Sequence, residues 1–188
     1  MRLEEISSTR DLGVVAEESQ IAIAQVERLS GVVDDLLARS RTGAEAASSI
    51  SLDSVLASLQ REWQPAFAAA RRTIRVTGTR GLRVQAAPGS LAQIFSTLLE
   101  NSLAHGAGTV TVAARCSGPS VVIEVSDEGA GIAAGLAPHI FEGSVSSSGT
   151  GLGLAVARDL AAAHGGRLEL VAAPGAQFAL FLSGGAAG

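Results

Sequence analysis

The sequence predicts a two-layer α+β domain that is preceded by a helical arm. After about residue 50, helix-like and strand-like segments alternate irregularly, without the strict order of a doubly wound parallel sheet. Residues 17–41 instead carry a continuous helical periodicity. Apolar residues make up 47% of the 188 residues, which is enough for one or two compact cores.

The arm is predicted by apolar residues at alternating steps of three and four, namely Val26, Leu29, Val33 and Leu36. This spacing is typical of a helix that packs against another helix. The next segment, RTGAEAASSIS at residues 41–51, is small, polar and without periodicity, which indicates a linker. We therefore expect an arm over residues 1–45 and a globular domain over residues 46–188.

Within the globular domain, each element has a local signal. A helix over 53–70 carries apolar residues at helical spacing, and Pro88 suits the first turn of a second helix that runs to the sequence LLENSLAHG. Gly118-Pro119 predicts a hairpin turn between two strand-like runs. The remaining expectations are strands at 73–77, 82–86, 109–116, 120–127, 167–172 and 177–182, and a helix at 153–163.

Composition excludes several function classes. The chain has no Lys and a net charge of −4, so a nucleic-acid partner is not implied. Its apolar runs are shorter than the roughly 18 residues of a membrane span, and its first residues lack the apolar stretch of a signal peptide. A lone Cys116 and three scattered His residues exclude an intramolecular disulfide and a zinc-type cluster.

The first motif with possible chemistry is LLENSLAHG. In a regular helix, Asn101 lies at the edge of the apolar stripe, close to Ile94. A carboxamide oxygen at the rim of a cleft can bind Mg²⁺, which prefers oxygen ligands and is usually shared with substrate phosphates. The alternative is that Asn101 and His105 only finish the helix before Gly106.

The second motif is VVIEVSDEGAGI, in which a strand-like run ends at Asp127. A carboxylate at a buried strand end can accept a hydrogen bond from an exocyclic amine such as that of adenine. Gly129 and Gly131 would let the backbone approach the ring closely. The alternative is ordinary Asp-x-Gly turn chemistry.

The third motif is GTGLGLAVARDLAAAHGG, in which Gly149, Gly151 and Gly153 lead into a helix. The free N–H groups of such a helix start can bind an anion without a charged side chain. The spacing does not match a dinucleotide fingerprint, and the absence of Lys excludes a Walker motif.

Taken in order, the three motifs resemble the catalytic, ATP-binding domain of sensor histidine kinases, within the family shared with gyrase, the Hsp90 chaperones and MutL. The resemblance covers residues 50–183, with Asn101 in the N box, 127–131 in the G1 box, 139–142 in the F box and 149–154 in the G2 box. It implies a Bergerat-type α/β sandwich that binds ATP and Mg²⁺ under a mobile lid at 132–148. The residues it assigns to nucleotide binding are Asn101 (also to Mg²⁺), His105, Asp127, Gly129, Gly131, Ile132, Gly149, Thr150, Gly151, Leu152 and Gly153.

The family transfers phosphate to a His in a motif similar to His-Glu-Leu-Arg-Thr-Pro, which this chain lacks. We read His105, His139 and His164 as packed or capping residues, and we expect the acceptor to lie upstream of a truncated chain. The resemblance implies a histidine kinase that is inactive in autophosphorylation as this fragment. It also implies a homodimer through residues 17–41, a response regulator as partner, and a cytoplasmic location with membrane attachment only through upstream segments.

Departures from the family pattern keep two alternatives open. Thr97 and Ala104 stand where many relatives have Asn and a basic residue, and no Arg or Lys occurs between Arg115 and Arg158. An arginine that neutralises the γ-phosphate can contribute roughly 10³–10⁵ in rate in other enzyme classes. The chain could therefore be a catalytically silent nucleotide-binding or dimerising regulator. An anti-sigma-type serine kinase is the second alternative, and the helical arm argues against it.

Overall fold

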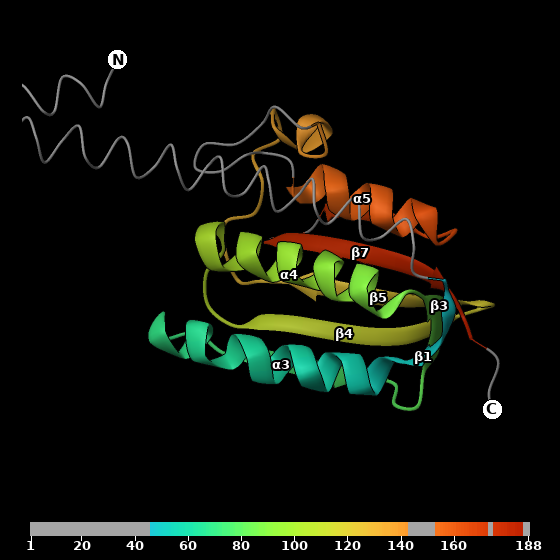
Figure 1. Ribbon diagram of the computed structural model, residues 1–188. Helices are drawn as coiled ribbons and strands as arrows, with labels where there is room; N and C mark the ends of the chain where they lie inside the picture. Colours follow the sequence, from blue (N-terminus) through green and yellow to red (C-terminus); the bar gives the residue numbers. More distant parts are fainter. Residues whose placement is uncertain (1–45, 143–152, 173–174, 186–188) are drawn as a thin grey trace, which may run out of the picture.

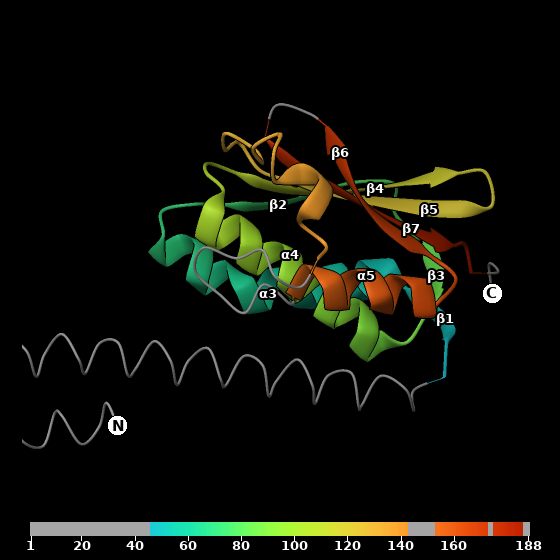
Figure 2. The same cartoon turned by 90° about the horizontal axis from the view of Figure 1, so that it is seen from above.

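The computed structural model describes residues 46–142, 153–172 and 175–185. In these residues a mixed sheet is covered on one side by helices, which makes two layers (Figures 1 and 2). The predicted α+β, two-layer fold is therefore confirmed. The predicted arm and the dimer contact at 17–41 lie outside the described residues, as do Gly149, Thr150, Gly151 and Leu152.

The main sheet of the described residues has five strands in the spatial order β2-β4-β5-β7-β6. Neighbouring strands are antiparallel, except that β2 and β4 are parallel. The hairpin predicted at Gly118-Pro119 joins β4 to β5, and Gly118 takes φ +59° in its turn. The strands are β2 (Ile74–Gly78), β4 (Val110–Ser117), β5 (Ser120–Ser126), β6 (Arg167–Ala172) and β7 (Ala176–Ser183).

Three helices of the described residues form the second layer, and α4 lies between α3 and α5 (Figure 2). They are α3 (Leu52–Ala69), α4 (Pro88–His105) and α5 (Gly153–Ala163), and a short 3-10 helix, η1 (Ala137–His139), precedes the undescribed segment 143–152. All three α-helices match the predicted ranges within a residue or two. The apolar stripe of α4 is almost completely buried against the sheet and the other helices, at Leu91, Ile94, Phe95, Leu98 and Leu99.

The linker prediction was wrong for residues 48–51. These residues form β1 (Ser48–Ser51), which pairs antiparallel with β3 (Arg83–Ala86) in a separate two-stranded sheet. Ile50 lies opposite the fully buried Val84, and the guanidinium of Arg83 donates hydrogen bonds to the side chain and the carbonyl of Ser49 at 2.8 and 2.6 Å. A serine-rich segment carries no strand pattern of its own, so its partner strand decides its conformation.

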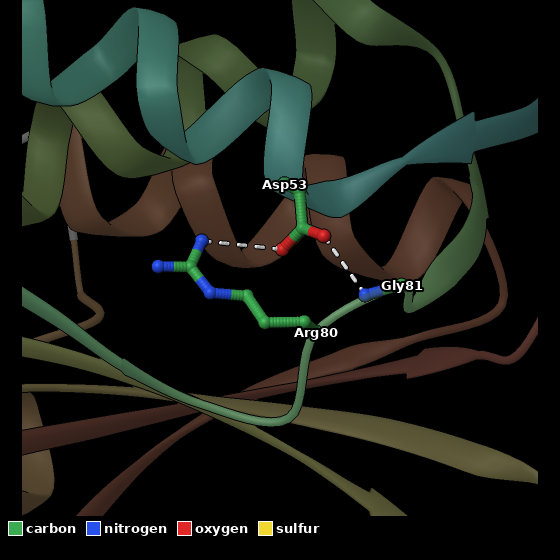
Figure 3. A network of polar contacts seen from close by, with 3 residues as sticks. All are labelled: Asp53, Arg80 and Gly81. Atoms are coloured by element: carbon green, nitrogen blue, oxygen red, sulfur yellow. Dashed lines mark hydrogen bonds and ion pairs between the residues drawn. The ribbon is translucent and has the colours of Figure 1, made fainter.

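The turn between β2 and β3 is attached to the start of α3 (Figure 3). Asp53 accepts a hydrogen bond from the backbone N–H of Gly81 at 2.8 Å and forms an ion pair with Arg80 at 3.5 Å. The Arg80 side chain is 70% exposed, so the hydrogen bond contributes more to holding this turn than the ion pair does.

Long polar side chains cover the sheet face that carries no helix. Arg167 stacks on Phe181, its neighbour across the β6–β7 pair, with 3.8 Å between the guanidinium carbon and the ring centroid. Arg115 pairs with Glu124 across β4 and β5 at 3.1 Å. The arginine stems shield apolar surface while their charged ends stay in water, so a third layer is not required.

Over the three described stretches of the chain, we find no helix that combines the length and the apolar character needed to cross a membrane.

Candidate functional site

Asp127 is the buried carboxylate around which the candidate site is built. Asp127 directly follows the last residue of β5, and only 7% of its surface is exposed. Its backbone N–H donates to the carbonyl of Ala176 at the start of β7, and its Oδ1 accepts the N–H of Gly129 at 2.7 Å. A carboxylate with so little solvent needs such a donor. The structure therefore confirms that Asp127 lies at a buried strand end.

Glycines surround this carboxylate because side chains would collide with it. A Cβ built on Gly129 would lie 2.7 Å from Oδ1 of Asp127, and one built on Gly106 would collide with Oδ2. A Cβ on Gly175 would collide with the Asp127 carbonyl, and Gly175 also takes φ +90°. Bare backbone therefore packs against the carboxylate on two sides, at positions that only glycine fits.

The end of α4 is connected to the segment that follows β5. Glu128 donates its backbone N–H to the carbonyl of Ala107 at 2.9 Å, and its side-chain Oε2 accepts the N–H of Thr109 at 2.8 Å. Gly106 is the C-cap of α4, so the helix that carries Asn101 ends against Asp127.

The start of α5 lies against the same helix. A Cβ built on Gly153 would lie 3.2 Å from the Thr97 methyl group. Asn101 is one turn after Thr97, about 40° around the axis, and is half-buried. Along the axis, Asn101 lies about 6 Å from Thr97 and about 7.5 Å from Gly106. The second half of α4 therefore brings Asn101, Asp127 and Gly153 into one region.

The other predicted site residues have more varied positions. His105 is the exposed last residue of α4. Gly131 takes φ +79°, and a Cβ built on it would lie 3.0 Å from the carbonyl oxygen of Gly175. Ile132 is partly buried against the hydrophobic core, which is a structural role beyond the ligand contact predicted for it.

Three residues near the site were not assigned to it from the sequence. Thr97 contacts the start of α5, as described above. Arg158 of α5 lies over the ring of Phe141 at 5.3 Å, and Phe141 meets Phe178 edge-on at 6.3 Å. Arg72 contacts the end of α4. The only sequence signal for Arg158 was that it is the first basic residue after Arg115, and Arg72 had no signal at all.

Solved structures with the same fold include several histidine kinases. AdeS from Acinetobacter baumannii superposes with a TM-score of 0.74 at 21% identity, over 97% of this chain and 91% of that one. Full-length ShkA, solved in complex with AMPPNP, superposes with a TM-score of 0.75 at 24% identity, over 96% of this chain and 41% of that one. The catalytic domain of ThkA superposes with a TM-score of 0.67 at 20% identity, over 73% of this chain and 97% of that one. The fold is thus the Bergerat-type α/β sandwich of such catalytic domains.

Sequence relatives carry similar names. The sensor histidine kinase ZraS of Klebsiella oxytoca is 36% identical over 85% of this chain and 36% of its own length. The signal transduction histidine-protein kinase AfsQ2 of Streptomyces coelicolor is 30% identical over 87% of this chain and 32% of its own length. The sensor-like histidine kinase SenX3 of Mycolicibacterium smegmatis is 29% identical over 90% of this chain and 48% of its own length. The chain thus spans between about a third and a half of the length of these curated relatives.

The profile of the family described as "Histidine kinase-, DNA gyrase B-, and HSP90-like ATPase" matches residues 86–185. This match covers more than half of the chain and contains α4, β5, the start of α5 and the glycines around Asp127. The chain therefore belongs to the family of histidine kinase-, DNA gyrase B- and HSP90-like ATPases.

Proposed function

We propose that this chain is the ATP-binding catalytic part of a sensor histidine kinase. One observation carries the proposal: the second half of α4 contacts the carboxylate of Asp127 through Gly106 and the start of α5 through Thr97, with Asn101 between them. A nucleotide that lies along this part of α4 would meet a carboxylate at one end and a helix N-terminus at the other. That order of groups suits a purine at Asp127 and phosphates at α5.

Asp127 is the group we assign to adenine. Its carboxylate would accept a hydrogen bond from the exocyclic amine, and the N–H of Gly129 holds Oδ1 at 2.7 Å so that the group is already oriented. Orientation before binding reduces the entropy lost on binding. The backbone at Gly106 and Gly129 packs directly against the carboxylate, which helps to hold it in one orientation.

Asn101 is the residue we assign to Mg²⁺. Across the described parts of the chain, no group of three or more His, Cys, Asp or Glu residues could hold a metal ion. A protein cage for the ion is thus not offered there, whereas one amide oxygen together with nucleotide phosphates is a donor set that suits Mg²⁺. The bound ion would neutralise charge on the phosphates. Gly149, Thr150, Gly151 and Leu152 would contribute backbone N–H groups next to Gly153.

The γ-phosphate would pass to a His outside this chain and from there to a response regulator. His139 is exposed and pairs with Glu142 at 2.9 Å, and His164 is half-buried just after α5. Neither lies beside Asp127 or the second half of α4 in sequence or in its described contacts. His105, which ends α4, is assigned to the nucleotide, so the proposal places the acceptor outside this chain. In this proposal residues 17–41 form the homodimer contact, and the domain works in the cytoplasm.

Isothermal titration of Mg-ATP tests the adenine assignment. Removing the carboxylate charge in Asp127→Asn should weaken binding by about 10- to 100-fold, because hydrogen bonds to charged groups contribute about 1.5–3 kcal/mol. Asp53→Asn is the matched control, since Asp53 is at the first turn of α3, roughly 24 Å along that helix from its other end, where Arg72 contacts α4. Equal affinities of the Asp127→Asn variant and the unmodified chain would remove Asp127 from the site.

A separate experiment distinguishes the kinase from a silent nucleotide-binding regulator. The chain is mixed with γ-labelled ATP and a helical hairpin from a relative that contains the acceptor His. Label on that His is expected, and its absence at full ATP occupancy would favour the silent regulator.

A further inference from the structure

The end of α3 turns so that Arg72 faces α4. Arg71 takes φ +55°, its N–H donates to the carbonyl of Ala68 at 2.9 Å, and the N–H of Arg72 donates to the carbonyl of Phe67 at 2.8 Å. This pair of bonds is the Schellman arrangement of a helix C-terminus. The residue at its far end, here Arg72, packs back on Phe67, with 5.3 Å between guanidinium and ring.

The guanidinium of Arg72 binds two parts of the chain at once. Its Nη1 donates to the carbonyls of Ser102 and Leu103 in the last turn of α4, the second at 3.4 Å. Its Nε donates to the carbonyl of Gly108, beyond the helix, at 2.9 Å. The last carbonyls of a helix carry partial negative charge, so a fixed cation stabilises them, here beside the Gly106 N–H that the Ser102 carbonyl also accepts.

The residues from Gly106 to Thr109 are held from the opposite side by Glu128. Its backbone and carboxylate bond to Ala107 and Thr109, at 2.9 and 2.8 Å. Gly108 takes φ +60° and has no room for a Cβ beside the Glu128 side chain. This loop, residues 106–109, is therefore fixed between Arg72 and Glu128, and its first residue lies against the carboxylate of Asp127.

We propose that Arg72 is a positioning residue for adenine recognition, which it serves by fixing loop 106–109 against Asp127. This proposal rests on the proposed role of Asp127. The planar guanidinium reaches carbonyls of both the helix and the loop from one position, whereas a Lys ammonium is a point charge that does not reproduce this fork. Arg72 touches neither Asp127 nor, in the proposed site, the nucleotide, so its effect on binding passes through the loop.

The test compares ATP with GTP, because adenine presents an amine at the position where guanine presents an oxygen acceptor. Affinities are measured by titration for the unmodified chain, Arg72→Ala, Arg72→Lys, Asp127→Asn and the Arg72→Ala/Asp127→Asn double variant. Arg61→Ala is the control, because Arg61 is exposed on α3 and contacts only Ser58 of the same helix among its described partners. Thermal unfolding of each variant sets a temperature at which all are folded.

We expect Arg72→Ala to weaken ATP binding about five- to tenfold, with GTP binding changed much less. Arg72→Lys should lie between Arg72→Ala and the unmodified chain, and should stay testable if the Ala variant unfolds. In the Asp127→Asn background the Arg72 substitution should have almost no further effect on ATP affinity. A merely structural role for Arg72 would lower ATP and GTP affinity equally.

Three results would overturn the inference: an equal loss for both nucleotides, the same loss in the Asp127→Asn background, or no loss at all. If Asp127→Asn itself binds ATP as the unmodified chain does, the proposed adenine site fails and the inference fails with it. If Asp127→Asn loses affinity and Arg72→Ala does not, only the inference about Arg72 fails.

Discussion

Gly106→Ala is a steric test of the site at a position whose backbone angles suit alanine. Gly106 has φ −87° and ψ −178°, which alanine adopts freely. The added methyl group would lie 2.5 Å from Cγ of Asp127 and 2.7 Å from the carbonyl oxygen of Ser102. Ordinary contacts between such atoms are about 3.5–4.0 Å, so the carboxylate has to retreat by about 1 Å.

That retreat determines the expected magnitude. A shift of about 1 Å would lengthen the 2.7 Å bond from Gly129 to Asp127 beyond hydrogen-bonding distance. Loss of this hydrogen bond lowers the free energy of unfolding by about 1.5–3 kcal/mol. Replacing Gly by Ala reduces the conformational entropy of the unfolded chain, which raises the free energy of unfolding by about 0.4–1 kcal/mol. We expect a net loss of about 1–2 kcal/mol in the free energy of unfolding, a fall in Tm of about 2–8 °C, and ATP binding weakened at least tenfold.

The assay pairs thermal unfolding with titration of Mg-ATP. Gly135→Ala is the matched control, because Gly135 has nothing within 4 Å of a built Cβ. It should leave both quantities within experimental error or raise Tm slightly. In an Asp127→Ala background the Gly106 substitution should destabilise less, since the colliding carboxylate is gone and only the contact with the Ser102 carbonyl remains. Unchanged stability and ATP affinity of Gly106→Ala would refute the reasoning.

Three further predictions concern the metal, the end of α3 and the core. Asn101→Ala should reduce the gain in ATP affinity that Mg²⁺ confers, while affinity in EDTA stays the same; equal Mg²⁺ gains in titration would contradict the metal assignment. Arg71→Gly should raise the free energy of unfolding by about 0.5–1 kcal/mol, because φ +55° suits glycine; a lower urea midpoint would contradict the Schellman turn. Leu98→Ala should cost about 2–5 kcal/mol, measured by urea unfolding, because Leu98 is completely buried in α4; a cost below about 1 kcal/mol would contradict that placement.

The elements that the sequence predicted correctly carry local signals. The helices over 53–70 and 153–163 and the hairpin at Gly118-Pro119 were predicted because their signals lie within a few residues along the chain. The placement of Asp127 at a buried strand end was predicted for the same reason. By contrast, β1 was missed because Ser48–Ser51 becomes a strand only through its pairing with β3.

Gly106 illustrates the same limit at the site. In the sequence it is an ordinary helix stop, yet in the fold its missing side chain makes room for a carboxylate 21 residues later. Arg72 likewise follows a helix without any pattern of its own, and its side-chain hydrogen bonds are to residues at least 30 positions away.

The sequence by itself determined the type and order of most helices and strands and the three motifs that led to the ATPase family, because periodicity, turn chemistry and motif spacing are local properties. Only the tertiary structure decided that the end of α4, Asp127 and the start of α5 lie together, and that Arg72 and Glu128 hold the loop between them. The physical reason is that a hydrogen bond or a steric limit between distant residues depends on how the layers pack, which no short stretch of sequence encodes.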